Sequence, residues 1–238
     1  MNKLSTNHGE INLPAFMSVA TRGAVRNVSP TELKEVGAEI ILSNTYHLMQ
    51  RPGIKLVKKA GGLHKFMNWS GPILTDSGGY QVFSLAKHRK IFEDGVEFRS
   101  EYDGSKVVLT PESVIKAEKD LGVDIAMVLD VNTKYGCSWE EAREAVRLTT
   151  KWARMARKVK MNPGQKMFGI IQGSVFRDLR ERSVKELLEL DFDGYAIGGE
   201  CQADGEKKLN EVLDWVVPML PKDKPVYLMG IGNPKDIK

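Results

Sequence analysis

The strongest constraint on the fold of this chain is a regular alternation of short apolar runs with amphipathic segments. Seven runs are continuous rather than alternating in polarity, which is typical of parallel strands buried on both faces. They occupy residues 14–20, 39–45, 71–76, 124–130, 167–173, 194–199 and 226–232. The pattern predicts an α/β fold in which helices pack against one parallel sheet.

Helix start signals and one interruption lie between the apolar runs. Ser138 and Glu141 form a capping box, which predicts a long helix running toward residue 160. Thr110 followed by Pro111 combines a cap residue with proline at the first helical position. Residues 91–109 break the alternation with two Asp-Gly turn signals, and they predict a β-hairpin insertion after the third strand.

Polar residues and glycines end six of the seven apolar runs. These ends are Ser43-Asn44-Thr45, Asp76-Ser77-Gly78, Asp130, Gln172-Gly173, Gly198-Gly199 and Gly230-Ile231-Gly232. A doubly wound sheet would spread such ends along a crevice, whereas a barrel brings them to one mouth, where active sites are built. The pattern therefore favours a (β/α)8 TIM barrel.

The number of strands is one short of that barrel, which needs eight. After Gly232 the chain continues with Asn233 and Pro234, which is again a helix start signal. We therefore expect residues 1–238 to form a single incomplete barrel domain that lacks its C-terminal strand and whatever follows it.

Composition narrows the class of protein. Hydrophobic residues make up 42% of the chain and charged residues 28%, which is ordinary for a globular protein. The opening residues lack the apolar core of a secretory signal, and no run approaches the roughly 18 residues of a membrane span. Cys137 and Cys201 cannot form a disulfide framework and are not spaced as metal ligands. We expect a cytoplasmic protein without membrane contact, whose net charge of +4 permits a polyanionic partner without indicating one.

Residues 74–85 (LTDSGGYQVFSL) resemble the signature of the tRNA-guanine transglycosylases, also called queuine tRNA-ribosyltransferases. Other segments match that family in order and spacing: 40–52 (IILSNTYHLMQRP), 62–67 (GLHKFM), 95–105 (GVEFRSEYDGS), 171–175 (IQGSV), 195–199 (YAIGG) and 227–232 (YLMGIG). The resemblance implies a TIM barrel with a zinc-binding insertion near the C-terminus. It also implies exchange of guanine at the tRNA wobble position for a 7-deazaguanine, queuine or its aminomethyl precursor, by double displacement at C1′.

The resemblance assigns Asp76 to acid/base work and Asp130, Gln172 and Gly199 to base recognition. Guanine carries two adjacent donors, N1–H and the exocyclic amine, so the Asp130 carboxylate could accept from both. Gln172 could donate to O6 or N7, and the backbone N–H near Gly199 could reach O6. The other expected substrate contacts are Ser77, Gly78, Gly79 and a stacking ring, Tyr80. The expected RNA-binding residues are Gly230, Ile231, Gly232, Asn233, Pro234, Lys235 and Asp236.

The family's nucleophilic aspartate lies on the eighth strand, and its cysteine and histidine zinc ligands follow. We expect both to be absent from this chain, so that the isolated 238 residues neither exchange bases nor hold zinc. Val131-Asn132 and Glu200 depart from the family's usual residues, which leaves the incoming base undetermined. Expected partners are tRNA, the purine or 7-deazaguanine base, and a second chain in a homodimer or heterodimer.

Other interpretations are open at the level of sequence. The chain could be a catalytically inactive relative that binds tRNA or a partner, or an unrelated TIM-barrel glycosidase. Tyr80 could pack in the core, Asp130 could cap a helix, and Asp76 could be a turn residue. The basic run at 151–160 is most simply a solvated helix face rather than a phosphate contact.

Overall fold

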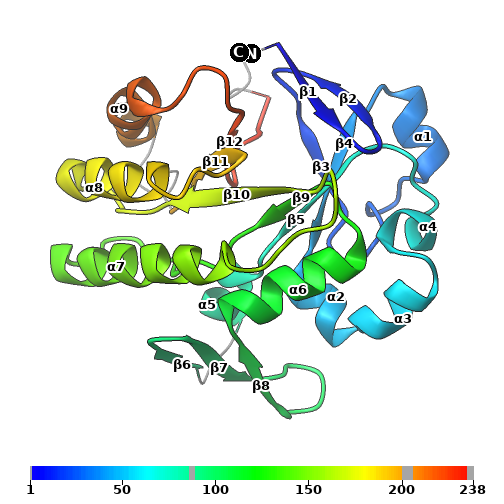
Figure 1. Cartoon of the computed structure of the whole chain (residues 1–238), viewed down its shortest axis with the longest axis horizontal. Helices are drawn as coiled ribbons and strands as arrows, with labels where there is room; N and C mark the ends of the chain where they lie inside the picture. The colour runs from blue at the N-terminus through cyan, green and yellow to red at the C-terminus, as the bar shows by residue number, and fades with distance from the viewer. Residues whose placement is uncertain (1, 86–88, 200–205, 235–238) are drawn as a thin grey trace.

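The computed structural model describes residues 2–85, 89–199 and 206–234, and a curled, seven-stranded parallel sheet forms its centre (Figure 1). The strands are β3 (Met17–Val19), β4 (Ile40–Asn44), β5 (Ile73–Asp76), β9 (Ile125–Met127), β10 (Lys166–Ile171), β11 (Gly194–Ile197) and β12 (Val226–Leu228). All seven predicted strands are therefore present. Their order in the sheet follows their order in the chain, with β3 and β12 at the two edges. A doubly wound sheet reverses its strand order at a switch point, so the observed order favours a TIM-like half-barrel instead.

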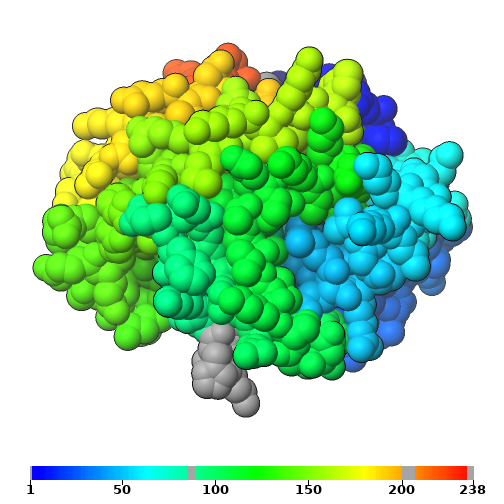
Figure 2. Space-filling model, turned by 60° about the horizontal axis from the view of Figure 1, so that its bottom comes forward, coloured from blue at the N-terminus to red at the C-terminus, as the bar shows by residue number. Residues whose placement is uncertain are grey.

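Helices cover the outer face of the sheet. They are α1 (Pro30–Glu35), α2 (Thr45–Gln50), α3 (Ile54–Lys59), α4 (Leu63–Met67), α5 (Gly79–Leu85), α6 (Pro111–Leu121), α7 (Trp139–Ala156), α8 (Arg177–Leu188) and α9 (Glu206–Val216), followed by a 3-10 turn (Val217–Met219). Helices α6 to α9 pack side by side in chain order. Figure 2 shows the surface on this side passing from cyan segments through green to yellow ones. None of the helices in the described part of the chain has the length and apolar content that a bilayer crossing requires.

The predicted cap of the longest helix is confirmed. The Ser138 hydroxyl accepts from the Glu141 N–H at 3.2 Å, and the Glu141 carboxylate accepts from the Ser138 N–H at 2.8 Å. Helix α7 ends at Ala156, short of residue 160. There the chain turns, and the Arg157 guanidinium donates to the carbonyls of Leu190 and Asp191 after α8.

A three-stranded antiparallel sheet stands apart from the barrel strands. It consists of β6 (Arg89–Phe92), β7 (Gly95–Arg99) and β8 (Lys106–Leu109), between α5 and α6 in the chain. Its β6–β7 turn contacts α7, because the Trp152 indole donates to the Glu93 carbonyl at 2.9 Å. The Lys151 amine forms ion pairs with Glu93 and Asp94. The first lysine of the basic run therefore has intramolecular partners, as expected of a helix face.

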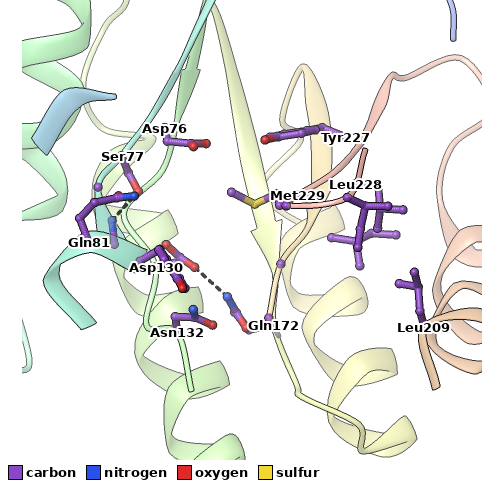
Figure 3. A pocket seen from close by; sticks show the side chains of 18 residues that line it. Asp76, Ser77, Gln81, Asp130, Asn132, Gln172, Leu209, Tyr227, Leu228 and Met229 are labelled. Carbon is purple, nitrogen blue, oxygen red and sulfur yellow. Dashed lines mark hydrogen bonds between the residues drawn. The ribbon is translucent and has the colours of Figure 1, made fainter. Parts of the chain in front are cut away.

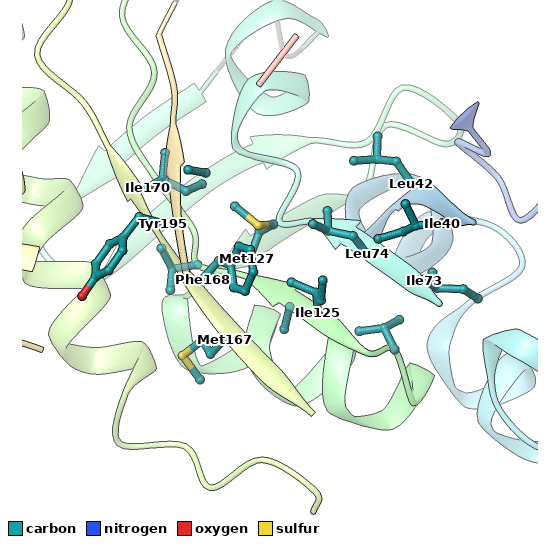
Figure 4. Close-up of a cluster of buried hydrophobic side chains, with 14 of the residues drawn as sticks. Ile40, Leu42, Ile73, Leu74, Ile125, Met127, Met167, Phe168, Ile170 and Tyr195 are labelled. Atoms are coloured by element: carbon teal, nitrogen blue, oxygen red, sulfur yellow. The ribbon is translucent and has the colours of Figure 1, made fainter. Parts of the chain in front are cut away.

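The main core lies between the sheet and the helices (Figure 4). Ile73, Leu74, Ile125, Met127 and Ile170 are all buried there, from three neighbouring strands. Continuous apolar runs produce this core because side chains on both faces of each strand are covered. A second antiparallel pair, β1 (Lys3–Thr6) with β2 (Gly9–Asn12), packs at the N-terminal ends of the strands.

A buried carboxylate links that hairpin to the sheet. Asp124, just before β9, accepts from the backbone N–H of Ile73 at 2.9 Å. It also accepts from His8 Nδ1 at 2.8 Å and His64 Nε2 at 3.0 Å, and the two imidazole rings stack at 3.5 Å. His8 belongs to the β1–β2 turn and His64 to α4, so one side chain joins three separate segments.

Replacing Asp124 with asparagine should lower the free energy of unfolding by about 1–3 kcal/mol, because the amide group places donors against donors in a buried site. Urea unfolding at neutral pH measures this loss. Asp120→Asn is the matched control, since that carboxylate is partly exposed and pairs only with Lys58 at 2.7 Å. The control should change stability by less than about 1 kcal/mol. Equal effects of the two substitutions would contradict the role of Asp124.

The same variant tests a pH dependence. Burial alone would raise the pKa of Asp124, but hydrogen bonds from His64, His8 and the Ile73 N–H outweigh it and hold the pKa below its usual 3.8. A depressed pKa means that the ionised carboxylate stabilises the fold above the unfolded-state value. The stability difference between wild type and Asp124→Asn should therefore persist at neutral pH and shrink as the pH falls below 3.8.

Candidate functional site

The C-terminal ends of the sheet strands border one cavity of about 480 Å³ (Figure 3). Its lining comes from the ends of β5, β9, β10, β11 and β12 and from helices α5 and α9. The lining residues are Asp76, Ser77, Gly78, Gly79, Tyr80, Gln81, Asp130, Asn132, Gln172, Ile197, Gly198, Gly199, Leu209, Tyr227, Leu228, Met229, Gly230 and Ile231. Five of the six predicted strand ends therefore meet there. The sixth, at Asn44, lies behind the wall and donates to Gln81 at 2.9 Å.

Two carboxyl groups border this cavity, and the charge of Asp130 raises the pKa of Asp76. Asp130 is 6% exposed, and burial raises its pKa to about 6 against the opposing hydrogen bond from Gln172. Asp76 is the last residue of β5, and burial followed by the charge of Asp130 raises its pKa to about 7. The buried Oδ1 of Asp76 has no hydrogen-bond partner among the described residues. The pair can thus hold one proton near neutral pH.

Gln172 is bonded to Asp130 rather than standing free. Its Nε2 donates to Asp130 Oδ2 at 2.7 Å, and its backbone N–H donates to Ser183. Its buried Oε1 has no partner within the described ranges. One amide N–H is committed to Asp130, so the second N–H and Oε1 are the atoms left for a ligand.

Two glycines are required by close approach. A Cβ on Gly79 would lie 2.3 Å from Asp130 Oδ1, so any side chain there would displace the carboxylate. Gly199 has a φ of 92°, and a Cβ on it would lie 2.8 Å from Arg180 Nη2. Both glycines line the cavity, so its backbone stays bare at these positions, as a flat ligand requires.

Tyr80 lies at the cavity, at the start of α5. Its side chain is 52% exposed, so the alternative of core packing is wrong. Ser77 is buried, and its hydroxyl accepts from the Gly79 N–H at 3.3 Å. The predicted cluster at residues 76–80 therefore forms one continuous wall.

Several lining residues were missed by the sequence interpretation. Tyr227 on β12 points toward Asp76 across the cavity (Figure 3), and burial followed by the Asp76 charge raises its pKa. Asn132 lies beside Gln172, and its position two residues after Asp130 is the signal that could have identified it. Leu209 on α9 carries no such signal, because it is an ordinary apolar position of an amphipathic helix.

A third buried carboxyl group contacts the strand that ends at Asp76, but it does not line the cavity. Glu118 on α6 is fully buried, and its Oε1 accepts from the hydroxyls of Thr45 and Thr75 at 3.0 and 3.2 Å. Burial raises its pKa well above the usual value, with the charge of Asp76 acting in the same direction. Burial therefore favours the uncharged form of Glu118 beside Asp76.

The predicted RNA-binding segment only partly borders the cavity. Gly230 and Ile231 line it, and Asn233 and Pro234 are exposed. A Cβ on Gly232 would lie 2.6 Å from the Phe16 ring, so this stretch passes close to the segment before β3. Lys235 and Asp236 lie outside the described residues, as do Glu200 and Cys201.

One group of side chains in the described ranges has the donor set of a metal site. It is His8, His64 and Asp124, whose ligand atoms lie within 4.8 Å of one another at the opposite end of the sheet. It does not fit the cysteine-containing zinc site that the resemblance implies. Of the two cysteines, Cys137 is free and buried, and Cys201 lies outside the described part of the chain.

Known proteins of one family are similar to this chain along nearly its whole length. A family profile described as queuine tRNA-ribosyltransferase matches residues 1–238. The queuine tRNA-ribosyltransferase of Desulforamulus reducens is 56% identical over 234 residues, covering 98% of this chain and 63% of that protein. The enzyme of Desulforudis audaxviator that bears the same name is 53% identical, covering 98% of this chain and 63% of that protein. The one of Dictyoglomus turgidum is 50% identical, covering 100% of this chain and 62% of that protein. The chain thus spans about 63% of the length of its curated relatives.

Proposed function

Because the chain belongs to the queuine tRNA-ribosyltransferase family, we propose that the protein containing it exchanges guanine in tRNA for a 7-deazaguanine base at the wobble position. Residues 1–238 would form most of one catalytic barrel domain. The observation that supports this most directly is the convergence of Asp76, Asp130 and Gln172 on one cavity at the C-terminal strand ends. An inactive relative that serves only as a scaffold has no need of this arrangement.

Asp130 is the group suited to recognise the base. Its ionised carboxylate accepts from guanine N1–H and the exocyclic amine, and the bond from Gln172 keeps it in place. Ser77, Gly78 and Gly79 leave a flat wall, and the exposed Tyr80 ring can stack on the base, worth about 1–3 kcal/mol. Gly199 supplies a backbone N–H for O6. The target base must leave the anticodon-loop stack, which costs less than leaving a duplex.

Asp76 is the group suited to move a proton. Breaking the C1′–N9 bond leaves the electron pair on guanine N9, which then takes a proton. The incoming base must lose its N9 proton when its N9 atom bonds to C1′. A carboxyl group with a pKa of about 7 can do both, as acid in the first half-reaction and base in the second.

Double displacement also needs a nucleophile that holds C1′ between the two steps. Asp76 and Asp130 are the carboxylates on the cavity wall in the described part of the chain, and both already have roles. We propose that the nucleophile comes from the part of the protein beyond these 238 residues, as does the structural zinc site. The segment at residues 230–236 and a second copy or related chain complete the proposed tRNA complex.

Labelled-guanine incorporation tests this proposal. The full-length protein should incorporate guanine into unmodified tRNA that carries guanine at the wobble position, and not into tRNA lacking it. The isolated 238-residue chain should bind guanine without exchanging it, and it should hold no stoichiometric zinc by elemental analysis. Failure of the full-length protein would reject the function. Robust exchange by the 238-residue chain would instead reject the proposal that the nucleophile lies beyond these residues.

A further inference from the structure

A fully buried arginine forms hydrogen bonds with both of the turns that contain Gln172 and Gly199. Arg180, on α8, is 0% exposed. Its Nε donates to the Ser174 carbonyl at 2.7 Å, and its Nη1 donates to the carbonyls of Ile171 and Gly198 at 2.9 and 2.7 Å. Burying a guanidinium is costly, so an apolar side chain of similar volume would suit this position better if packing were the only requirement.

The bond to the Gly198 carbonyl fixes the direction of the next N–H group. The carbonyl of Gly198 and the N–H of Gly199 belong to one trans peptide unit, in which C=O and N–H point in opposite directions. Because the carbonyl points to Arg180, which does not line the cavity, the Gly199 N–H points away from Arg180. That N–H has no hydrogen-bond partner among the residues that the structure describes. Gly199 itself lines the cavity.

The backbone at Gly198 and Gly199 has unusual conformational freedom, so the hydrogen bond from Arg180 restrains the orientation of their shared peptide. Gly198 and Gly199 are adjacent glycines, and Gly199 has a positive φ of 92°. Rotation of their shared peptide would present a carbonyl to the cavity in place of an N–H. An N–H donates to the O6 atom of a 6-oxo purine such as guanine, whereas a carbonyl accepts from the amine of a 6-amino purine.

We propose that Arg180 is a positioning residue that holds the Gly198–Gly199 peptide with its N–H toward the base, and thereby selects 6-oxo over 6-amino purines. This inference rests on the proposed function of the cavity as a base site. Arg180 does not line the cavity. It acts through the carbonyls of Ile171 and Gly198, which also set the spacing between Gln172 and Gly199.

The test compares guanine with 2,6-diaminopurine, which keeps the 2-amine but carries an amine at position 6 and no hydrogen on N1. The loss of N1–H affects wild type and variant alike, so a change in the affinity ratio reports on position 6. Affinities for both are measured by calorimetry on the full-length protein, and guanine exchange is measured alongside. Arg180→Met should weaken guanine binding by about tenfold or more, the equivalent of one lost hydrogen bond in a buried site. Its guanine-to-diaminopurine affinity ratio should fall by a similar factor, while kcat at saturating guanine changes much less than KM.

Arg157→Met is the control, because Arg157 also donates to two backbone carbonyls, those of Leu190 and Asp191, but away from the cavity. It should lower thermal stability without changing the affinity ratio. If Arg180→Met does not fold, Arg180→Lys serves, since a lysine keeps the charge but cannot span the three carbonyls.

A wild-type affinity ratio in folded Arg180→Lys or Arg180→Met would overturn the inference, as would an equal loss of ratio in Arg157→Met. Wild-type protein that binds guanine but does not exchange it would reject the proposed function while leaving this inference standing on the binding data. Wild-type protein that binds no guanine would overturn both.

Discussion

Asp130→Ala should abolish guanine exchange by the full-length protein, with a loss in kcat/KM of about a hundredfold or more. The carboxylate is the acceptor for two adjacent guanine donors, and its removal leaves both donors without their charged partner. The loss should fall on base affinity, so guanine binding measured by calorimetry should weaken in parallel. Unchanged exchange would reject the pocket assignment.

Two further variants separate recognition from folding in that experiment. Asp130→Asn has nearly the same volume, but its amide group offers a donor where guanine also offers donors, so it should be nearly as defective as Asp130→Ala. Asp120→Ala removes a partly exposed carboxylate paired with Lys58, and it should leave exchange unchanged. If Asp130→Asn were active while Asp130→Ala was not, the defect would lie in packing rather than in recognition.

Asp76→Asn should lower the rate of exchange by about 10²–10⁴-fold while leaving guanine binding nearly intact, because an amide can neither deliver nor accept the N9 proton. Steady-state kinetics with labelled guanine gives kcat, and calorimetry gives the guanine affinity. A large loss of affinity with little loss of kcat would contradict the acid/base role and make Asp76 a binding residue instead.

The pH profile gives a second test of the same assignment. Base recognition needs ionised Asp130, whose pKa is about 6, so kcat/KM for tRNA should fall as the pH drops through that value. Expulsion of guanine needs protonated Asp76, whose pKa is about 7, so the same parameter should fall as the pH rises above it. In Asp76→Asn the alkaline limb should disappear and the acid limb should remain. An unchanged alkaline limb would assign that proton to another group.

Much of the fold could be predicted because it depends on local patterns. Continuous apolar runs indicated seven buried parallel strands, and the structure contains all seven in chain order. The capping box at Ser138 could be predicted equally well, since it involves residues only three positions apart. The end of α7 was less predictable, because the Arg157 side chain contacts carbonyls more than 30 positions away.

The candidate site was predictable where chemistry and position coincide. Asp76, Asp130 and Gln172 are polar residues that follow apolar strands, and such residues in a barrel meet at one mouth. Leu209 and Arg180 were not identified, because nothing in their local sequence separates them from ordinary core or helix positions. Tyr227 was noted only as part of a matched segment, without a place in the site. Their roles depend on which segments lie opposite them in space.

The sequence by itself determined the class of fold, the strands and the strand ends at which a ligand would bind, because these follow from the spacing of apolar, polar and glycine residues. Only the tertiary structure decided the charge state of the site and the direction of its donors. The pKa values of Asp76 and Asp130 rise because distant segments bury them together. The Gly199 N–H points away from Arg180 because α8 brings that guanidinium to the Gly198 carbonyl, 18 residues further along the chain.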